Sequence, residues 1–266
     1  MITTNSSLCK NANRINLKLY NFGYADVNTQ WQGYVQNPTF SRLYYIASGN
    51  AFIAFEGTTL ELIPGNWYLL PTGFSFNYHC SHEMGHLFFH ITLSGPDEID
   101  LLANLKAPIY IHDPSNPDKC FRQYLYKDSL ITALMLKEKI YNIVLKLIEN
   151  DPILPETTTY SPCIKKAVEF INNNLSKKLT LADVAESAYV SNCTLTNKFK
   201  KELKITVQEY ILAQRMFKAV QLLKNSKMSV AEISEKLGFS DQFYFSKCFK
   251  HKFGSSPREY RKSKID

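Results

Sequence analysis

Four histidines, His79, His82, His86 and His90, lie close together in the sequence and have the side chains that bind zinc or iron. A barrel metalloenzyme usually carries a His-x-His pair followed by a glutamate ligand, and that pattern is absent here. We place a turn at His82 and His86, which would keep them from converging with the other two. We therefore expect no metal and no cofactor, and a metal-dependent enzyme is the least favoured alternative.

Other catalytic signatures are also missing from the sequence. There is no Gly-x-Ser-x-Gly elbow, no Walker loop and no dinucleotide-binding fingerprint. We expect that the protein is not an enzyme.

A repeated segment near the end of the chain carries residues of a different chemistry. Residues 180–201 and 229–251 match one another, with one extra residue in the second copy. Thr180 and Ser229 each precede an acidic residue by three positions, which is the pattern of a capping box at a helix start. A turn and a second helix follow in each copy. The repeat therefore predicts two helix-turn-helix units.

The second helix of each copy has an inward and an outward face. Ser191 and Ser240 are expected to cap these helices. Asn and Gln can bond adenine, Lys can bond guanine, and Phe or Thr can contact the thymine methyl in a major groove. The alternative is that the outward positions are ordinary exposed residues, and their repetition in a basic segment favours DNA. The expected base-reading residues are Cys193, Thr196, Asn197, Gln242, Phe243, Ser246 and Lys247.

The charge of the chain is concentrated in the same region. Residues 161–266 hold 20 Lys and Arg against 10 Asp and Glu, so they carry +10, and residues 1–160 carry −3. This asymmetry predicts a polyanion-binding module joined to a near-neutral one. The expected phosphate contacts are Lys198, Lys200, Lys201, Lys250, Lys252 and Arg258.

A single helix is expected between the two repeated units. Residues 208–225 contain no Gly or Pro, and eighteen helical residues span roughly 27 Å. That length is near the ~34 Å repeat of duplex DNA. One chain could therefore present two reading helices to successive major grooves.

The first half of the chain has the pattern of a β domain. Short apolar or alternating runs are separated by Gly, Pro and Asn, which predicts an antiparallel barrel or sandwich. The expected strands are 42–48, 51–56, 66–70, 74–80 and 86–93. Residues 117–150 then change to a helical period. The apolar stripe of this helix, expected to pair with a second copy of the chain, is Leu136, Ile140, Ile143 and Leu147.

Several stretches resemble the AraC/XylS family of transcriptional regulators. The C-terminal ones are LTLADVAESAYVS, FKKELKITVQEYI, RMFKAVQLL and SVAEISEKLGFSDQFYFSKCFKHKFGSSPREYR, within Ile164–Arg261. The N-terminal ones, RLYYIASGNAFIAFEG, LIPGNWYLLPTG and FFHITLSG, are similar to the family's cupin-like sensor barrel. The resemblance implies duplex DNA and RNA polymerase as partners. It also implies a helical dimerisation segment, so we expect a homodimer.

These observations together predict a two-domain α+β protein. Residues 1–150 would form a cupin-like antiparallel β-barrel with the helical segment 117–150, residues 151–162 a linker, and residues 163–266 the all-α double helix-turn-helix domain. The expected function is sequence-specific regulation of transcription that responds to a small molecule, such as a sugar, in the barrel. The alternative is a barrel that serves only for dimerisation or protein docking.

Aromatic and polar side chains of the barrel are the candidates for an effector pocket. They are Arg42, Tyr44, Trp67, Tyr78 and His90. The sequence has no apolar run long enough to span a membrane and no secretory h-region at its start. Its six cysteines form no CxxC pair. We therefore expect a cytoplasmic protein with free thiols.

Overall fold

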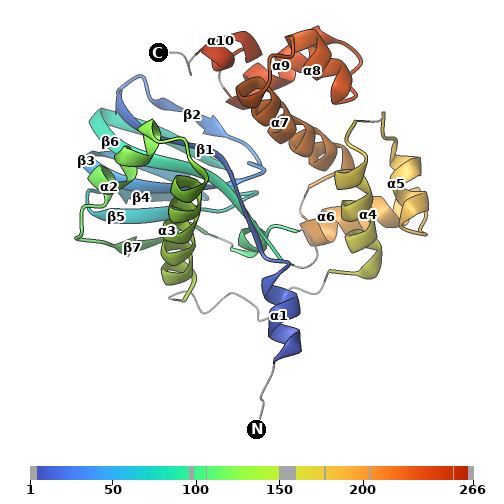
Figure 1. Cartoon of the computed structure of the whole chain (residues 1–266), viewed down its shortest axis with the longest axis horizontal. Coiled ribbons are helices and arrows are strands. Elements are labelled where there is room, and N and C mark those ends of the chain that lie inside the picture. The colour runs from blue at the N-terminus through green and yellow to red at the C-terminus, as the bar shows by residue number, and fades with distance from the viewer. Residues whose placement is uncertain are drawn as a thin grey trace. The chain divides into compact units, whose positions relative to one another are not determined.

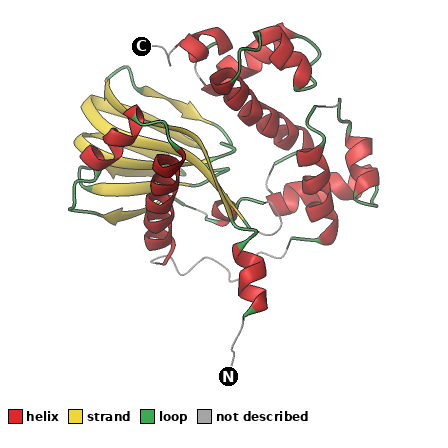
Figure 2. Ribbon diagram, in the orientation of Figure 1, coloured by secondary structure: helices red, strands yellow, loops and turns green. Residues whose placement is uncertain are grey.

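The computed structural model describes residues 5–95, 99–105, 107–149, 160–176, 178–203, 205–253 and 255–262. They form two compact units, with the division before Tyr160. The first unit is built mainly of strands and the second of helices (Figure 2), which confirms the predicted two-domain α+β fold. Residues 151–159 of the predicted linker lie outside the described residues, and the predicted domain limits stay a prediction.

The first unit contains a seven-stranded antiparallel sheet (Figure 1). Its main path runs β1-β6-β3-β5-β7, and β2 pairs with β6 while β4 pairs with β3. The strands are β1 (Asn16–Asn28), β2 (Gln32–Val35), β3 (Ser41–Phe55), β4 (Thr58–Leu62), β5 (Asn66–Leu70), β6 (Phe76–Ser94) and β7 (Ile109–His112). A short helix, α1 (Ser6–Ala12), precedes them.

Two of the predicted turns are wrong, because β3 and β6 are each one long strand. The pairing of β3 with β6 continues past this point, with shifts of register between Ile46 and Ser48 and between Gly49 and Ala51 inside the ladder. Gly49 has φ +66°, and a Cβ there would lie 2.0 Å from the carbonyl oxygen of Glu83. Glycine therefore allows a local bulge instead of ending the strand. The predicted turn at His82 and His86 likewise lies inside β6.

The helical segment of the first unit is interrupted rather than continuous. It consists of α2 (Asp118–Arg122), the 3-10 turn η2 (Gln123–Tyr126) and α3 (Leu130–Glu149), and another 3-10 turn, η1 (Leu101–Asn104), comes before β7. α3 therefore covers most of the predicted helix, and a break before Leu130 separates it from α2.

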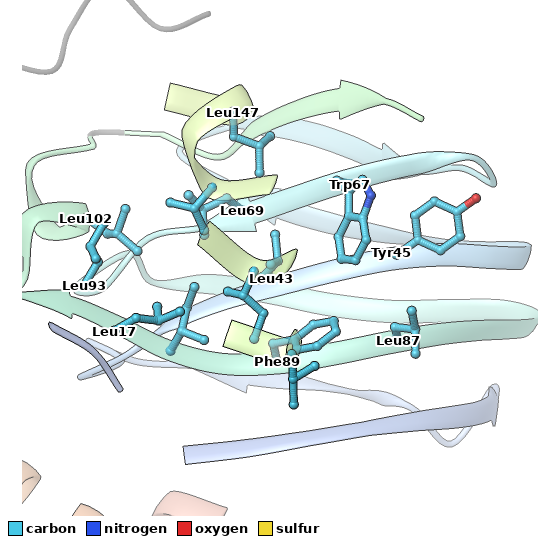
Figure 3. Packing of buried hydrophobic residues seen from close by; sticks show 14 of the residues in the cluster. Leu17, Leu43, Tyr45, Trp67, Leu69, Leu87, Phe89, Leu93, Leu102 and Leu147 are labelled. Atoms are coloured by element: carbon cyan, nitrogen blue, oxygen red, sulfur yellow. The ribbon is translucent and has the colours of Figure 1, made fainter. Parts of the chain in front are cut away.

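One face of α3 packs against the sheet of its own chain. Leu136, Ile140 and Leu147 are buried in a cluster with Leu43 and Trp67. Figure 3 shows Leu147 on the helix facing Leu69 and Trp67 of the sheet.

This packing corrects the predicted dimer stripe of Leu136, Ile140, Ile143 and Leu147. The first, second and fourth side chains are buried, and Ile143 packs at the edge of the same cluster. The three buried residues therefore belong to the fold of one chain and are not available to a second copy, and Ile143 is half-buried beside them. The predicted helical period of the apolar residues is correct, but the sheet of the same chain buries them.

The second unit is all helical. Its elements are α4 (Pro162–Asn173), α5 (Leu181–Ser187), α6 (Asn192–Leu203), α7 (Val207–Asn225), α8 (Val230–Lys236), α9 (Gln242–Phe253) and α10 (Pro257–Lys262). α7 coincides with the single helix predicted over 208–225. In Figure 1 it runs from the group of α4, α5 and α6 to that of α8, α9 and α10.

The repeat extends further than the two helix-turn-helix segments. α4 packs with α5 and α6, as α7 packs with α8 and α9 in one buried cluster. Helices α4 and α7 share the sequence Lys-Ala-Val, at 166–168 and 218–220. The Ala and the Val are buried in both helices. Each repeated unit is therefore a group of three helices.

Candidate nucleic-acid interface

The start of each helix-turn-helix unit is fixed by the predicted capping box. The Thr180 hydroxyl accepts a hydrogen bond from the Asp183 N–H, and the Asp183 carboxylate accepts one from the Thr180 N–H. Ser229 and Glu232 form the same pair in the second unit. These backbone donors hold the pKa of Asp183 and of Glu232 below the usual values. Both predicted boxes are confirmed.

The turn before α6 and the turn before α9 have the same backbone geometry. Tyr189 has φ +57° and Gly238 has φ +68°. The Tyr189 N–H donates to the Glu186 carbonyl, as the Gly238 N–H donates to that of Glu235. At this positive φ, tyrosine has a higher backbone free energy than glycine. The centre of the Tyr189 ring lies 4.5 Å from the Lys166 ammonium.

The caps of the two reading helices differ from the prediction in one case. In the first unit the Ser191 hydroxyl accepts from the Thr194 N–H, as expected. In the second unit the cap is Asp241, which accepts from the N–H groups of Phe243 and Tyr244 at 2.8 and 2.7 Å. The predicted cap Ser240 only donates to Asp241. The extra residue of the second copy lies before the cap, so Asp241 takes the position of Ser191.

The outward face of α6 carries the predicted residues of the first unit. Cys193, Thr196 and Asn197 are all exposed. Thr196 donates to the Asn192 carbonyl oxygen, and the Asn197 amide lies 3.6 Å from the Cys193 sulfur. On the opposite face Leu195 and Phe199 are fully buried. α6 therefore presents a small polar surface with one amide that is able to read a base edge.

The outward face of α9 is larger and more aromatic. Phe243 is 77% exposed, Lys247 is exposed, and Gln242 and Ser246 are half-buried. Tyr244, which the sequence reasoning missed, is 51% exposed beside Phe243. Its position in the repeat is held by Thr194 in α6, and a comparison of the two copies would have drawn attention to it.

Most of the predicted phosphate-binding cations are on the surface. Lys200, Lys201, Lys250 and Arg258 are exposed, and Lys198 is half-buried. The Lys252 ammonium lies 4.8 Å from the centre of the Phe217 ring, so it already packs on α7.

A central arginine of α7 contacts both repeats of the helical unit. Arg215 donates from Nε to the carbonyl oxygen of Leu175, which follows α4, at 3.3 Å. Its guanidinium carbon lies 5.6 Å from the centre of the Phe239 ring, in the turn before α9. Burial lowers the pKa of this arginine. Arg215 of α7 therefore links the end of α4 in the first repeat to the turn before α9 in the second repeat.

The predicted effector residues do not all lie on one face of the sheet. Arg42 pairs with Leu70, Tyr44 with Tyr68, and Tyr45 with Trp67 along β3 and β5. Neighbouring residues of a strand point to opposite faces. Tyr44 therefore belongs to the core cluster with Tyr68, whereas Trp67 belongs to the other cluster, under α3.

Trp67 is corrected as a pocket residue by this placement. It is fully buried, and its indole N–H donates to Asp113 at 2.9 Å. The other four candidates lie on the face of Tyr44: Tyr78 packs there, and His90 is the β6 partner of Arg42.

Three of the four clustered histidines pack against different aromatic rings along β6, and the fourth, His82, is exposed. His86 is buried against Trp31 and Tyr44, His90 stacks on Phe40, and His79 stacks on Phe52. No group of three or more His, Cys, Asp or Glu suited to a metal occurs among the described residues. No helix in this described part is long and apolar enough to cross a membrane.

Comparisons with known proteins agree with the geometry of the helical unit. A family model described as a helix-turn-helix domain matches residues 184–263. The Msm operon regulatory protein of Streptococcus mutans is 30% identical, over 87% of this chain and 88% of its own. The lactose operon transcription activator of Staphylococcus xylosus is 27% identical, over 83% of each chain.

A solved structure is similar over nearly the whole chain. Apo ToxT from Vibrio cholerae matches with a TM-score of 0.59 over 93% of this chain and 96% of its own, at 15% identity. At that identity the likeness shows the fold alone.

Proposed function

Because the chain belongs to the AraC/XylS family of transcriptional regulators, we propose that it reads an operator with α6 and α9 in successive major grooves. The protein is a DNA-binding regulator of transcription, and its curated relatives are regulators rather than enzymes. The proposal concerns how this chain recognises its site.

The observation that carries the proposal is the matched pair of exposed faces in the basic unit. Asn197 and Lys247 occupy equivalent positions of the two copies, and both are exposed. Amides favour adenine and ammonium groups favour guanine. We infer that the two units read different bases with the same geometry. The proposed base-reading set is Cys193, Thr196, Asn197, Gln242, Phe243, Ser246 and Lys247, to which we add Tyr244.

Replacing Lys247 with Ala tests this assignment. The variant is expected to lose about 1–3 kcal/mol on the best operator and to accept other bases at one position. An operator selected from random duplexes, followed by titration of its single-base variants, measures both effects. The matched control is Lys250→Ala, one turn further along α9, which should weaken all sequences equally. Uniform weakening by Lys247→Ala would instead make Lys247 a phosphate contact.

We propose that the β unit responds to a small molecule. The relatives named for the lactose and raffinose operons support a sugar as the class of effector. We further propose RNA polymerase as a partner at the promoter and the cytoplasm as the location of the protein. Both proposals rest on family membership.

We also propose that the active form is a homodimer joined through α3. The face of α3 turned away from the sheet carries exposed apolar residues, which would lose their contact with water against a second copy. They are Leu130, Ile131, Leu134, Met135 and Leu145. This face replaces the buried stripe that the sequence pattern suggested.

A charge placed in this face should separate the two copies. Leu134 is 60% exposed, so Leu134→Glu is expected to leave the fold intact and to give monomers by light scattering. Lys119→Glu, at an exposed position of α2, is the control and should remain dimeric. A Leu134→Glu protein that is still dimeric would place the interface elsewhere.

A further inference from the structure

The face of the sheet turned away from α3 carries a row of polar side chains. β3 and β6 pair so that Arg42 lies beside His90, Tyr44 beside Phe88, and Ile46 beside His86. Tyr44 and Ile46 belong to the core cluster on this face, and alternation along the strands brings Arg42 and His86 to the same side. Arg42, Tyr44 and His86 therefore form a line across the two strands.

Two buried polar atoms at the ends of this line have no hydrogen-bond partner among the described groups. They are Nη1 of Arg42 and Nδ1 of His86. The His86 side chain is only 3% exposed. Buried polar atoms are nearly always bonded, so each exception needs an explanation, such as strain, a water, an ion or a ligand.

The unpaired groups at the two ends have opposite hydrogen-bonding character. Burial lowers the pKa of His86 to about 4, so its ring is neutral near pH 7. The Ala25 backbone bonds this ring, and since backbone N–H groups of a paired strand are donors within the ladder, we assign the ring proton to Nε2, facing the Ala25 carbonyl. Nδ1 of His86 then accepts, whereas Nη1 of Arg42 donates.

Arg42 is a cation in apolar surroundings. Its guanidinium carbon lies 4.6 Å from the Phe40 ring centre and 5.7 Å from that of Phe76. The described groups that act on its pKa, besides burial, are the hydroxyls of Tyr44 and Tyr78, and neither is a carboxylate. A neutral acceptor would bond Nη1 but would not offset the buried charge, whereas an anion does both.

Tyr44 lies between the two ends of the row. From Arg42 to Ile46, the partner of His86, the chain advances four residues, or about 13 Å. The ring centre of Tyr44 is 5.3 Å from that of His86. Arg42 and the aromatic residues Trp31, Tyr78 and Phe88 of this face are partly exposed, so the row is within reach of solvent.

We propose that this row binds an anionic sugar, with its phosphate or carboxylate on Arg42 and a hydroxyl donating to His86. The inference rests on the proposed sensing function of the β unit and gives the effector its charge.

The test compares each anionic disaccharide with its neutral parent on the full chain by titration calorimetry. The pairs are trehalose 6-phosphate with trehalose, and lactobionate with lactose. We expect at least one anion to bind tenfold or more tightly than its parent, and the pair that shows this distinguishes phosphate from carboxylate. Arg42→Gln should abolish the preference, and Lys18→Gln, at an exposed position of β1, should keep it.

His86→Phe provides a second measurement at the other end of the row. It should weaken binding of the anion several-fold without changing the preference for the anion over its parent. A neutral parent that binds as tightly as its anion would overturn the anionic class but leave sugar sensing intact. No binding by any of the four compounds would overturn the inference, whereas the sensing function would fail only if no sugar bound the β unit.

Discussion

The affinity of this protein for duplex DNA is expected to fall roughly a hundredfold or more between about 50 and 200 mM salt, if about five phosphates are neutralised. Each neutralised phosphate releases condensed counterions, and added salt opposes that release. Residues 161–266 carry a net charge of +10. The exposed cations Lys200, Lys201, Lys250 and Arg258 are the ones we expect to supply most of these contacts.

The salt series is best measured with wild type and with Lys200→Ala on the same operator. Loss of one phosphate contact should lower the slope of log affinity against log salt by about one. Lys119→Ala, in α2 of the β unit, is the control and should leave the slope unchanged. An affinity that does not depend on salt would contradict phosphate binding by this unit.

A second large effect is expected from the buried face of α9. Phe249→Ala should destabilise the helical unit by about 3–5 kcal/mol. Phe249 is fully buried with Met216 and Phe245, and its ring packs edge-on to that of Tyr260 at 5.3 Å. Because α9 is short, the loss of this contact should also abolish base recognition by the second helix-turn-helix unit.

Phe243 offers a control of the same residue type on the same helix. It is 77% exposed, so Phe243→Ala should change stability by no more than about 0.5 kcal/mol while altering base preference. Both tryptophans, Trp31 and Trp67, lie in the first unit, so their fluorescence reports that unit alone. Phe249→Ala should lower the unfolding temperature of the helical signal and leave the fluorescence transition in place. An equal loss of stability in the two variants would show that burial of Phe249 is not what stabilises α9.

The helical unit was largely predictable from the sequence because its signals are local. A capping box joins residues three apart, and the buried pairs Leu195–Phe199 and Phe245–Phe249 are one helical turn apart. The duplication gave each signal twice. The cap of α9 was the exception, since Asp241 and Ser240 are both good caps and only the backbone geometry selects between them.

The β unit was less predictable because its contacts join distant residues. Glycine at position 49 is a turn signal in the sequence, yet the chain continues as one strand because β6 pairs along its whole length. Likewise, Trp67 and Arg42 both suit a pocket by composition, and only the register of β5 on β3 places them on opposite faces.

What the sequence alone determined is the fold class, the family and the faces of the reading helices, since helical periodicity and capping depend on neighbours within a few residues. Only the tertiary structure decided which partner each apolar stripe would find. The sequence pattern of Leu136, Ile140 and Leu147 is the same whether the stripe packs against a second copy or against its own sheet. Its own sheet covers it, because burial of apolar surface has no direction of its own, and the opposite face of α3 stays exposed.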